Sequence, residues 1–283
     1  MKKPIFIILY LFLIFCFSLL ESCKTQSHNY ARHFIPFIKD SIATVEYKKS
    51  LNNLNDHDFS YHYFTTRGNL ITPYRLLPPI VNLPIKKYPL VITLHNSSRI
   101  GLDNKSQLEP LARLWLDSNI RQKYQGYVVA PQFATRSTTY SFDTQRGILT
   151  SKPEPQLLAI MDLIDSIKKA YNIDEKRVYL VGYSMGASSV IDLLNFRPDQ
   201  FAAAVAIAGV PQFDHITPLK NIPIWLIHGK NDTENPFSGS ELFYKEINQR
   251  HRTRFWIFDQ RTHDNIISTA ILGEDIPKWL FAK

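Results

Sequence analysis

Short apolar runs alternate with stretches of helical periodicity along most of this chain. Runs such as 88–94 are typical of strands buried in a parallel sheet. Apolar positions spaced at helical intervals, as in 155–169, predict amphipathic helices between them. The predicted strands are 59–65, 70–77, 88–94, 127–130, 178–181, 201–208, 223–227 and 255–258, and the predicted helices are 108–116, 155–169, 185–196, 242–249 and 265–281. This alternation predicts the α/β class, with a mostly parallel sheet and helices on both faces.

The connections between these elements limit what else the fold contains. The first two strands meet at 67–69, where Arg-Gly-Asn favours a hairpin. We interpret 132–153 as a loop, and it carries the aromatic residues Tyr140 and Phe142. The connection over 209–223 is too short for a large helical insertion. We therefore expect no large cap domain.

The first residues have a secretory character. Lys2 and Lys3 precede an apolar run over 5–20, and a polar stretch begins after Cys23. A charged start followed by an apolar segment is typical of a signal peptide, and the position of Cys23 resembles the bacterial lipoprotein signal, in which this cysteine is lipidated. An uncleaved anchor or a plain signal peptide is the alternative, although the run is short for a bilayer span.

This interpretation divides the chain into three parts. We predict a lipoprotein signal peptide over 1–22, a tether and irregular N-terminal segment over 23–57, and an α/β domain over 58–283. The middle part is polar and aperiodic. With Cys23 lipidated, we expect the protein to be membrane-anchored in the cell envelope, at the outer membrane or the cell surface of a bacterium.

Composition and charge narrow the class of protein. The chain has 283 residues, of which 45% are hydrophobic and 20% charged, and this excludes global disorder. Two cysteines are too few for a disulfide-stapled mini-protein or a multi-cysteine zinc module. The net charge of +8 is scattered, which favours an ordinary solvated surface over a patch for an anionic membrane. No phosphate-binding loop or RNA-binding motif is present, so nucleic acid is not an expected partner.

The most informative segment is 178–187, which reads Val-Tyr-Leu-Val-Gly-Tyr-Ser-Met-Gly-Ala. A predicted strand, Gly182-x-Ser184-x-Gly186 and a predicted helix are the context of a nucleophile elbow. In so tight a turn, side chains at the two glycine positions would collide with neighbouring backbone. The turn presents the Ser184 hydroxyl at a helix N-terminus, where the Met185 N–H is a candidate donor to an oxyanion. The alternative is a turn of this sequence that has no catalytic role.

A serine hydroxyl needs a base to remove its proton, and an acid to orient that base. In the chain order expected with this elbow, the acid comes next. Asp232 lies just past the end of the predicted strand 223–227 and is the candidate acid. A turn aspartate that only caps local backbone is the alternative, and Glu234 is the rival carboxylate.

Nine histidines are present, so position along the chain decides which one is the base. His263 follows the predicted strand 255–258 and lies at the carboxyl edge of the sheet. His251 precedes that strand and lies at the wrong edge. His228 is on the strand that leads to Asp232, where a structural hydrogen-bonding role is favoured. We therefore predict His263 as the general base, with a plain loop histidine as the alternative.

The second oxyanion donor is expected from the loop that follows the predicted strand 88–94. This loop reads His-Asn-Ser-Ser over 95–98, and the backbone N–H of Ser97 is the candidate. The loop lacks the glycines expected there. Because asparagine tolerates positive φ better than most residues, we expect Asn96 to occupy a glycine-like conformation.

With these residues in place, the sequence resembles a group of α/β-hydrolases that includes dienelactone hydrolases, prolyl-oligopeptidase-like enzymes and esterase D/feruloyl esterases. Within this group it most resembles bacterial peptidases and esterases with a short hydrolase domain. The likeness covers about 74 to 280. It implies an α/β-hydrolase fold with Ser184 as nucleophile, Asp232 as acid and His263 as base. The segments that carry it are LHNSSRIGLDN (94–104) with Gln-Leu at 107–108, VAPQ (129–132), YNIDEKRVYLVGYSMG (171–186) and RPDQFAAAV (197–205).

The sequence departs from the pattern of this group at four positions. Asn96 and Ser98 replace glycines in the oxyanion loop, Ala187 replaces the second glycine after the elbow, and Thr262 replaces the glycine before the base. The loop departures raise the question of whether the oxyanion site is intact. The three side chains expected for catalysis are all present, which argues against an inactive member of the group.

Three functions fit these residues. The favoured one is a serine esterase that forms an acyl-enzyme on a carbohydrate-linked or small soluble ester. A serine peptidase of the prolyl-oligopeptidase-like type is the first alternative, although no propeller domain fits in front of residue 59. A non-catalytic surface binding protein on a hydrolase scaffold is the alternative from another class.

Tyr140 and Phe142 are candidates for lining an acyl or aromatic subsite. The alternative is that these two side chains only pack against the rest of the domain. The mechanism needs no metal or organic cofactor, and the oligomeric state is left open.

Overall fold

The computed structural model describes residues 32–36, 42–248 and 252–283. The predicted signal peptide 1–22, the lipidation site Cys23 and His251 lie outside the described residues, and their predicted roles stay predictions. Over the described ranges, none of the helices combines the length and the apolar character that crossing a bilayer requires.

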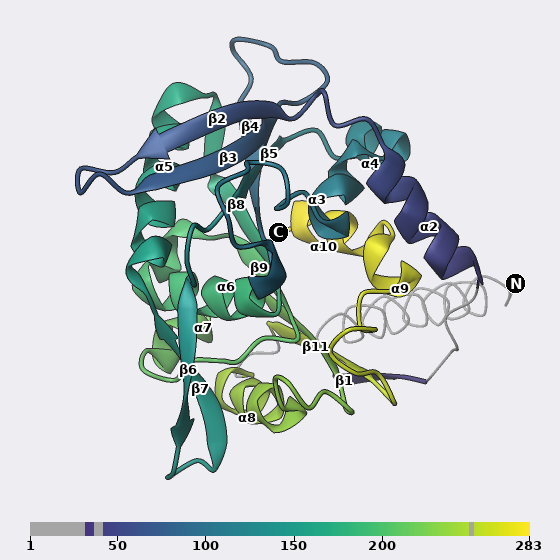
Figure 1. The fold of residues 1–283 in the computed structure, drawn as a ribbon, viewed down its shortest axis with the longest axis vertical. Coiled ribbons are helices and arrows are strands. Elements are labelled where there is room, and N and C mark those ends of the chain that lie inside the picture. The colour runs from purple at the N-terminus through teal and green to yellow at the C-terminus, as the bar shows by residue number, and fades with distance from the viewer. Residues whose placement is uncertain (1–31, 37–41, 249–251) are drawn as a thin grey trace, which may run out of the picture.

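Within the described residues, a sheet of nine strands runs through the middle of the molecule (Figure 1). The strand order is β1-β11-β10-β9-β8-β4-β5-β3-β2. From β1 to β5 neighbouring strands are parallel, whereas β3 is antiparallel to both β5 and β2. The strands are β1 (Arg32–Ile35), β2 (Ser60–Thr65), β3 (Ile71–Leu77), β4 (Tyr88–Leu94), β5 (Tyr127–Pro131), β8 (Ile173–Tyr183), β9 (Ala203–Ile207), β10 (Ile224–Gly229) and β11 (Thr253–Phe258). The predicted mostly parallel sheet is confirmed.

Helices cover both faces of this sheet, as Figure 1 shows. The helices α5 (Pro155–Ala170), α6 (Met185–Phe196) and α8 (Phe237–Ile247) lie on one face, and α7 (Ile216–Leu219) lies beside α6 and α8. The other face is covered by α2 (Ile42–Asn53), α3 (Pro110–Arg113), α4 (Ser118–Lys123), α9 (Thr269–Leu272) and α10 (Asp275–Phe281). The architecture is that of an α/β-hydrolase, and among the described residues no large cap is inserted.

Two apolar cores lie on opposite faces of the central strands. Successive side chains of a strand point to opposite faces. On β8, Leu180 therefore packs into the core under α5 and α6, whereas Tyr179 and Val181 pack into the core under α9 and α10. Because both faces of β4 and β8 are buried here, their sequences form apolar runs that do not alternate between apolar and polar residues. The same packing holds the ends of these strands in place.

The predicted loop over 132–153 is wrong for most of its length. β6 (Thr138–Asp143) and β7 (Ile148–Pro153) form an antiparallel hairpin that projects from the lower part of the molecule in Figure 1. The turn is stabilised by Asp143, whose Oδ1 accepts the N–H groups of Gln145 and Arg146, and by Gly147 at φ 67°. The Thr-Thr-Tyr-Ser-Phe run of β6 carries the β-branched and aromatic residues of a strand, and this signal was available in the sequence.

The irregular segment predicted before residue 58 is also wrong where the structure describes it. β1 extends the sheet by pairing with β11, and α2 packs beside α3 and α9. In α2, Thr44 and Leu51 are buried whereas the apolar Ile42 and Val45 are exposed, so the apolar residues of its sequence do not mark the buried face. Its position depends on tertiary contacts that the local pattern does not reveal.

Element ends differ from the predictions in smaller ways. α8 begins five residues earlier than the predicted 242, and α4 is an addition. The predicted helix 265–281 is divided into α9 and α10 around Gly273. The predicted helix 108–116 consists of α3 followed by the 3-10 turn η3 (Leu114–Leu116).

Candidate active site

Ser184 lies at the tip of a strained turn between β8 and α6. Its backbone has φ 57° and ψ −120°, a conformation that L-residues rarely adopt. A Cβ at Gly182 would lie 2.3 Å from the carbonyl oxygen of Gly186, and a Cβ at Gly186 would lie 2.1 Å from that of Leu94. Both glycines are therefore required by close backbone approach, as the sequence predicts. The turn places Ser184 at the N-terminus of α6, where its side chain is largely covered.

The structure brings Ser184, His263 and Asp232 together in one line. Nε2 of His263 lies 2.8 Å from Oγ of Ser184, and Nδ1 of His263 lies 2.7 Å from Oδ2 of Asp232. The three residues follow the carboxyl ends of β8, β10 and β11, which meet at the same edge of the parallel sheet. This is the relative placement that the chain order predicts. Such a line can move a proton from the serine hydroxyl to the imidazole.

Asp232 has two sets of partners, one for each carboxylate oxygen. Oδ1 accepts the backbone N–H groups of Glu234 and Asn235, while Oδ2 faces His263. Burial acts to raise the pKa of this carboxyl, but hydrogen bonds from His228, His263 and the Asn235 backbone outweigh burial and hold the pKa well below its usual range. Asp232 therefore both caps the local turn and orients His263. From the sequence, these two roles, a turn cap and a partner of the histidine, were alternatives.

The rival carboxylate Glu234 is placed differently. Its Oε2 lies 3.9 Å from Nε2 of His263, on the side of the ring that faces Ser184, and its side chain is exposed. A carboxylate there cannot hold the Nδ1 proton. Asp232 is thus the residue positioned to select the tautomer of His263.

His263 is buried between these partners. Burial lowers the pKa of its imidazole, but the hydrogen bond and the negative charge of Asp232 outweigh it, with smaller contributions from Glu234 and Asp264, and the pKa is raised above its usual value. His228 has the structural role that its strand position predicts. Its Nδ1 lies 2.7 Å from Oγ of Ser240, and its Nε2 lies 2.8 Å from the carbonyl oxygen of Asn235.

The loop after β4 holds its shape without the glycines that are expected there. Ser97 begins the 3-10 turn η2 (Ser97–Arg99), and Asn96 caps this turn by accepting the N–H of Ser98 at 2.8 Å. Asn96 has φ −75°, so the expected glycine-like conformation is wrong. The physical reason is a carboxylate: Glu109 accepts the backbone N–H of Asn96 at 3.1 Å and its side-chain amide at 2.6 Å.

This loop lies directly against the elbow. Leu94, the last residue of β4, pairs with Gly182, and the start of α6 touches the carbonyl groups of Leu94 and His95. Gly186, the second residue of α6, thus lies against the start of the loop that carries Ser97. The roles of Ser97 and Met185 as oxyanion donors stay predictions. Glu109 was missed by sequence reasoning because nothing in the local pattern pairs it with a residue thirteen positions earlier.

His95 anchors the base of the same loop. Its Nδ1 donates to the carbonyl oxygen of Asn96 at 2.7 Å, and its Nε2 accepts the N–H of Phe133 at 3.0 Å. Burial lowers the pKa of His95 to about 4, so the ring is neutral in the range where most enzymes work. Gln132 adds a further support, since its Nε2 donates to the carbonyl oxygen of Arg99 at 3.1 Å.

Comparison with known proteins identifies the family of the chain. The profile of the dienelactone hydrolase family matches residues 116–265, which is more than half of the chain and includes the elbow, Asp232 and His263. The chain belongs to the dienelactone hydrolase family. Its resemblance to this group at the level of sequence motifs is thereby confirmed.

Two curated relatives of this family member are named as esterases. The bifunctional acetylxylan esterase/xylanase XynS20E of Neocallimastix patriciarum is 28% identical over 158 residues, which cover 56% of this chain and 21% of that protein. Feruloyl esterase B of Talaromyces funiculosus is 27% identical over 161 residues, which cover 54% of this chain and 45% of that protein. The chain thus spans less than half of the length of either relative.

Solved structures place the family member in the same fold. A thermostable esterase superposes with a TM-score of 0.72 at 29% identity, over 80% of this chain and 62% of that one. Dipeptidyl peptidase 4 of Porphyromonas gingivalis superposes with a TM-score of 0.58 at 13% identity, over 80% of this chain and 35% of that one. The second likeness concerns the fold alone.

The β6–β7 hairpin of this dienelactone hydrolase family member lies beside the elbow helix. Tyr140 places its hydroxyl 3.1 Å from Oγ of Ser188, one helical turn beyond the nucleophile position. Ser188 in turn accepts the backbone N–H of Val210 at 2.8 Å. Phe142 is exposed near the tip of the hairpin and lies farther from the elbow. Of the two predicted subsite aromatics, Tyr140 is thus the one in contact with the helix that carries Ser184.

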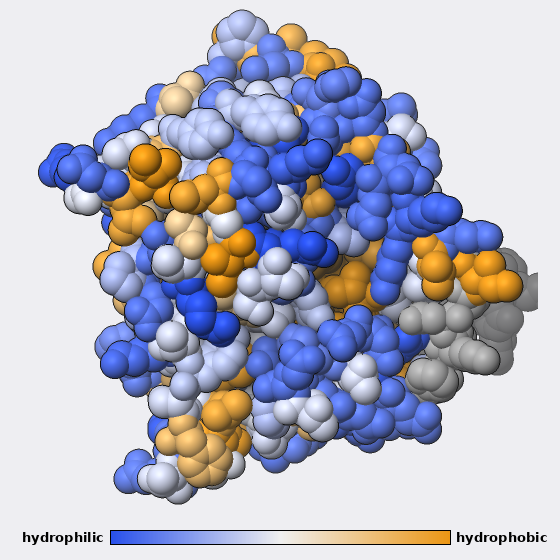
Figure 2. Space-filling view, viewed as in Figure 1, coloured by the Kyte–Doolittle hydropathy of each residue, from blue (hydrophilic) through white to orange (hydrophobic). Residues whose placement is uncertain are grey.

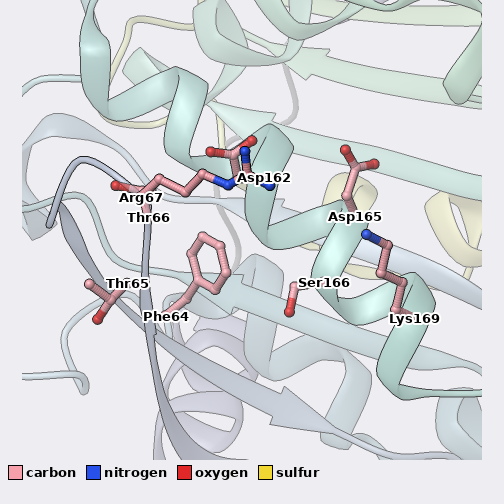
Figure 3. A pocket seen from close by; sticks show the side chains of 8 residues that line it. All are labelled: Phe64, Thr65, Thr66, Arg67, Asp162, Asp165, Ser166 and Lys169. Carbon is pink, nitrogen blue, oxygen red and sulfur yellow. The ribbon is translucent and has the colours of Figure 1, made fainter.

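A separate surface pocket of about 550 Å³ lies between the β2–β3 turn and α5. Figure 3 shows Arg67 extending across it toward Asp162 on α5. Its lining residues include none of Ser184, Asp232 and His263 and none of the loop after β4, so we do not assign this pocket to the candidate site. In the part of the chain that the structure describes, no group of three or more His, Cys, Asp or Glu side chains could hold a metal ion.

Proposed function

We propose that this protein is a serine hydrolase that cleaves carboxylic esters through an acyl-enzyme. The observation that carries the proposal is the line of hydrogen-bond distances from Asp232 through His263 to Ser184, 2.7 Å and 2.8 Å long. The strained elbow and the family membership support it. A line of this kind has the parts that nucleophilic catalysis needs: a nucleophile, a base and a group that orients the base.

The geometry suits the usual two steps of acyl transfer. In the first step, Oγ of Ser184 bonds to the ester carbonyl carbon while its proton passes to Nε2 of His263. The bond to the alcohol then breaks, and the alcohol leaves with that proton. In the second step, water gives a proton to His263 and attacks the acyl group, and the acid leaves as the proton returns to Oγ. Asp232 keeps Nδ1 protonated and stabilises the imidazolium in both steps.

We assign the oxyanion site to the backbone N–H groups of Met185 and Ser97. Met185 is the first residue of α6, so its N–H belongs to the free end of the helix, where the dipole favours negative charge. Ser97 supports the assignment through the pairing of β4 with β8 and the fixed turn that follows. Donors held in place before reaction are worth about a hundredfold or more in rate.

For the substrate, we propose an ester linked to a carbohydrate or a small soluble ester. The named activities of two relatives, acetylxylan esterase and feruloyl esterase, support an ester over a peptide bond. The contact of Tyr140 with the elbow helix supports an acyl subsite at the base of the hairpin.

Labelling by a fluorophosphonate probe tests the nucleophile. The wild-type protein is expected to react, and Ser184→Ala is expected to lose the label. Ser166→Ala, the same exchange on α5 away from the elbow, is the control and should label like wild type. No labelling of a folded wild-type protein would contradict the proposal and would favour a non-catalytic binding protein.

A substrate panel then separates esterase from peptidase. Acetylated xylan, feruloyl esters and a simple aryl acetate are compared with dipeptidyl amides, and each is scored by kcat/KM. The proposal expects the esters to be cleaved faster. A higher kcat/KM for the amides, lost in Ser184→Ala, would identify a serine peptidase instead.

We also propose that the protein is lipid-anchored at Cys23 in a bacterial cell envelope. The support is the N-terminal sequence alone, with its lysines, apolar run and cysteine. Metabolic labelling with a fatty acid is expected to mark the full chain and to fail with Cys23→Ala. A soluble, unlabelled wild-type protein would contradict the proposal.

A further inference from the structure

The loop that joins β3 to β4, residues 78–87, carries exposed apolar side chains that the proposed reaction does not use. Ile80, Val81, Leu83 and Ile85 are 50%, 56%, 48% and 98% exposed. In Figure 1 this loop protrudes at the top of the molecule, and Figure 2 shows hydrophobic surface at that edge. Single exposed apolar residues are ordinary, but four within six positions form a patch that indicates an interaction site.

The backbone of this loop is held so that its apolar side chains stay outside. The hydroxyl of Tyr88 donates to the carbonyl oxygen of Val81 and accepts the N–H of Leu83 at 3.1 Å. The side-chain amide of Asn172 donates to the carbonyl oxygen of Pro84 at 2.8 Å. A loop fixed in this way cannot fold its apolar tip back onto the domain. The exposure is therefore built into the fold.

The charge of the loop points to one kind of partner. Residues 78–87 contain Lys86 and Lys87 and no acidic residue. The ammonium group of Lys86 lies 5.0 Å from the centre of the Tyr88 ring, at the base of the apolar tip. Apolar side chains with cations just behind them suit a lipid interface, where the apolar groups enter the acyl boundary and the cations meet anionic headgroups.

We propose that loop 78–87 docks on an anionic lipid surface. The tip protrudes from the molecule in Figure 1, and a bilayer adapts to a protruding loop. The long Ile85 side chain, almost wholly exposed, is the deepest contact, and Lys86 and Lys87 remain at headgroup level.

The topology gives this docking a defined orientation. The loop precedes the start of β4, whereas Ser184, Asp232 and His263 follow the ends of the parallel strands, so the two lie at opposite edges of the sheet. Arg32 begins β1 at the edge where β4 begins, and Cys23 precedes it by nine residues, a reach of up to about 30 Å. A lipid on Cys23 would therefore be tethered to the edge of the sheet that carries the loop.

A single fluorescent label tests the docking directly. The chain from 24 to 283 keeps every described residue and contains no cysteine, since Cys16 and Cys23 precede it. Ile85→Cys gives one site for an environment-sensitive dye. Phe142→Cys is the matched control, because Phe142 is 62% exposed on the β6–β7 hairpin. Vesicles of phosphatidylglycerol and phosphatidylcholine are expected to brighten and blue-shift the dye at position 85 alone.

Charge variants and a lipid-free arm complete the test. Lys86→Gln with Lys87→Gln is expected to weaken vesicle binding about 25-fold, since each lysine near an anionic surface contributes about fivefold. No response at position 85, or an equal response at position 142, overturns the proposal. Equal binding to phosphatidylcholine alone overturns the assignment to an anionic surface. A response without lipid, with a doubled mass in light scattering, assigns the loop to a second copy of the chain. None of these readouts depends on Ser184, so they hold whether or not the proposed hydrolase activity is found.

Discussion

The hydroxyl of Tyr183 donates a hydrogen bond of 2.8 Å to the backbone carbonyl oxygen of His263. The two rings also stack, with centroids 5.3 Å apart. Tyr183 immediately precedes the elbow serine on β8, whereas His263 comes from the loop after β11. One side chain therefore positions His263 relative to Ser184, across two strands that do not pair with each other.

Tyr183→Phe is expected to lower kcat about fivefold and to leave KM nearly unchanged. The substitution keeps the stacked ring and removes one hydrogen bond, worth about 1 kcal/mol. Steady-state kinetics with an aryl ester measure the change, and a thermal melt checks the fold. An unchanged kcat would show that ring stacking alone positions His263.

Gly182→Ala and Gly186→Ala are expected to destabilise the protein by about 2–4 kcal/mol and to remove most of its activity. The added methyl groups would lie 2.3 Å and 2.1 Å from backbone atoms, closer than real contacts allow. Gly68→Ala is the control, because its nearest atom would lie 3.8 Å away. Urea denaturation compares the three variants. A stability like that of Gly68→Ala at either elbow position would contradict the described turn.

The pH dependence of kcat/KM is expected to follow the imidazole of His263. The ring accepts the serine proton only when neutral, so activity should rise with pH and level off above the pKa of the ring. Burial lowers this pKa, but Asp232 raises it by more, so the midpoint is expected above the ordinary value of 6.5. A rate profile from about pH 5 to pH 9 tests this. A wild-type midpoint at or below 6.5 would contradict the described environment.

Asp232→Asn tests the cause of that shift. The amide removes the negative charge and the proton acceptor that together raise the pKa of His263. The midpoint is therefore expected to move to lower pH, and kcat to fall about ten-thousand-fold as the tautomer is lost. Glu234→Gln is the matched control, and its exposed carboxylate should affect the profile only slightly.

Glu109→Ala is expected to lower kcat about tenfold with a small effect on KM. The variant leaves the N–H and the side-chain amide of Asn96 without their partner, and the loop that carries Ser97 would lose its fixed geometry. Glu246→Ala, an exposed position on α8, is the control. Equal activity in both variants would separate Glu109 from the oxyanion loop.

The strand ends and the proximity of Ser184, Asp232 and His263 could be predicted from sequence because each rests on a strong local signal. Buried strands such as β4 are apolar throughout, and the elbow has a required glycine on either side of Ser184. In a parallel sheet, residues that follow different strands meet at one edge, so the positions of Asp232 and His263 in the chain were enough to predict their proximity.

The oxyanion loop could not be predicted in the same way. Its missing glycines suggested strain at Asn96, yet the residue is extended because Glu109 satisfies its donors. That contact exists only after β4, α3 and the intervening loop have folded together. The helix α2 and the strand β1 were missed for a related reason, since their places are set by partners far along the chain.

The β6–β7 hairpin enters and leaves the domain at one place, because Thr138 and Pro153 pair with each other. Its two strands form a sheet of their own and share no ladder with the nine strands that carry the triad. Residues may be exchanged, added or removed toward its tip without moving Ser184, Asp232 or His263. The surface that this hairpin presents can therefore diverge, by natural variation or by engineering, while the arrangement at the elbow is inherited unchanged.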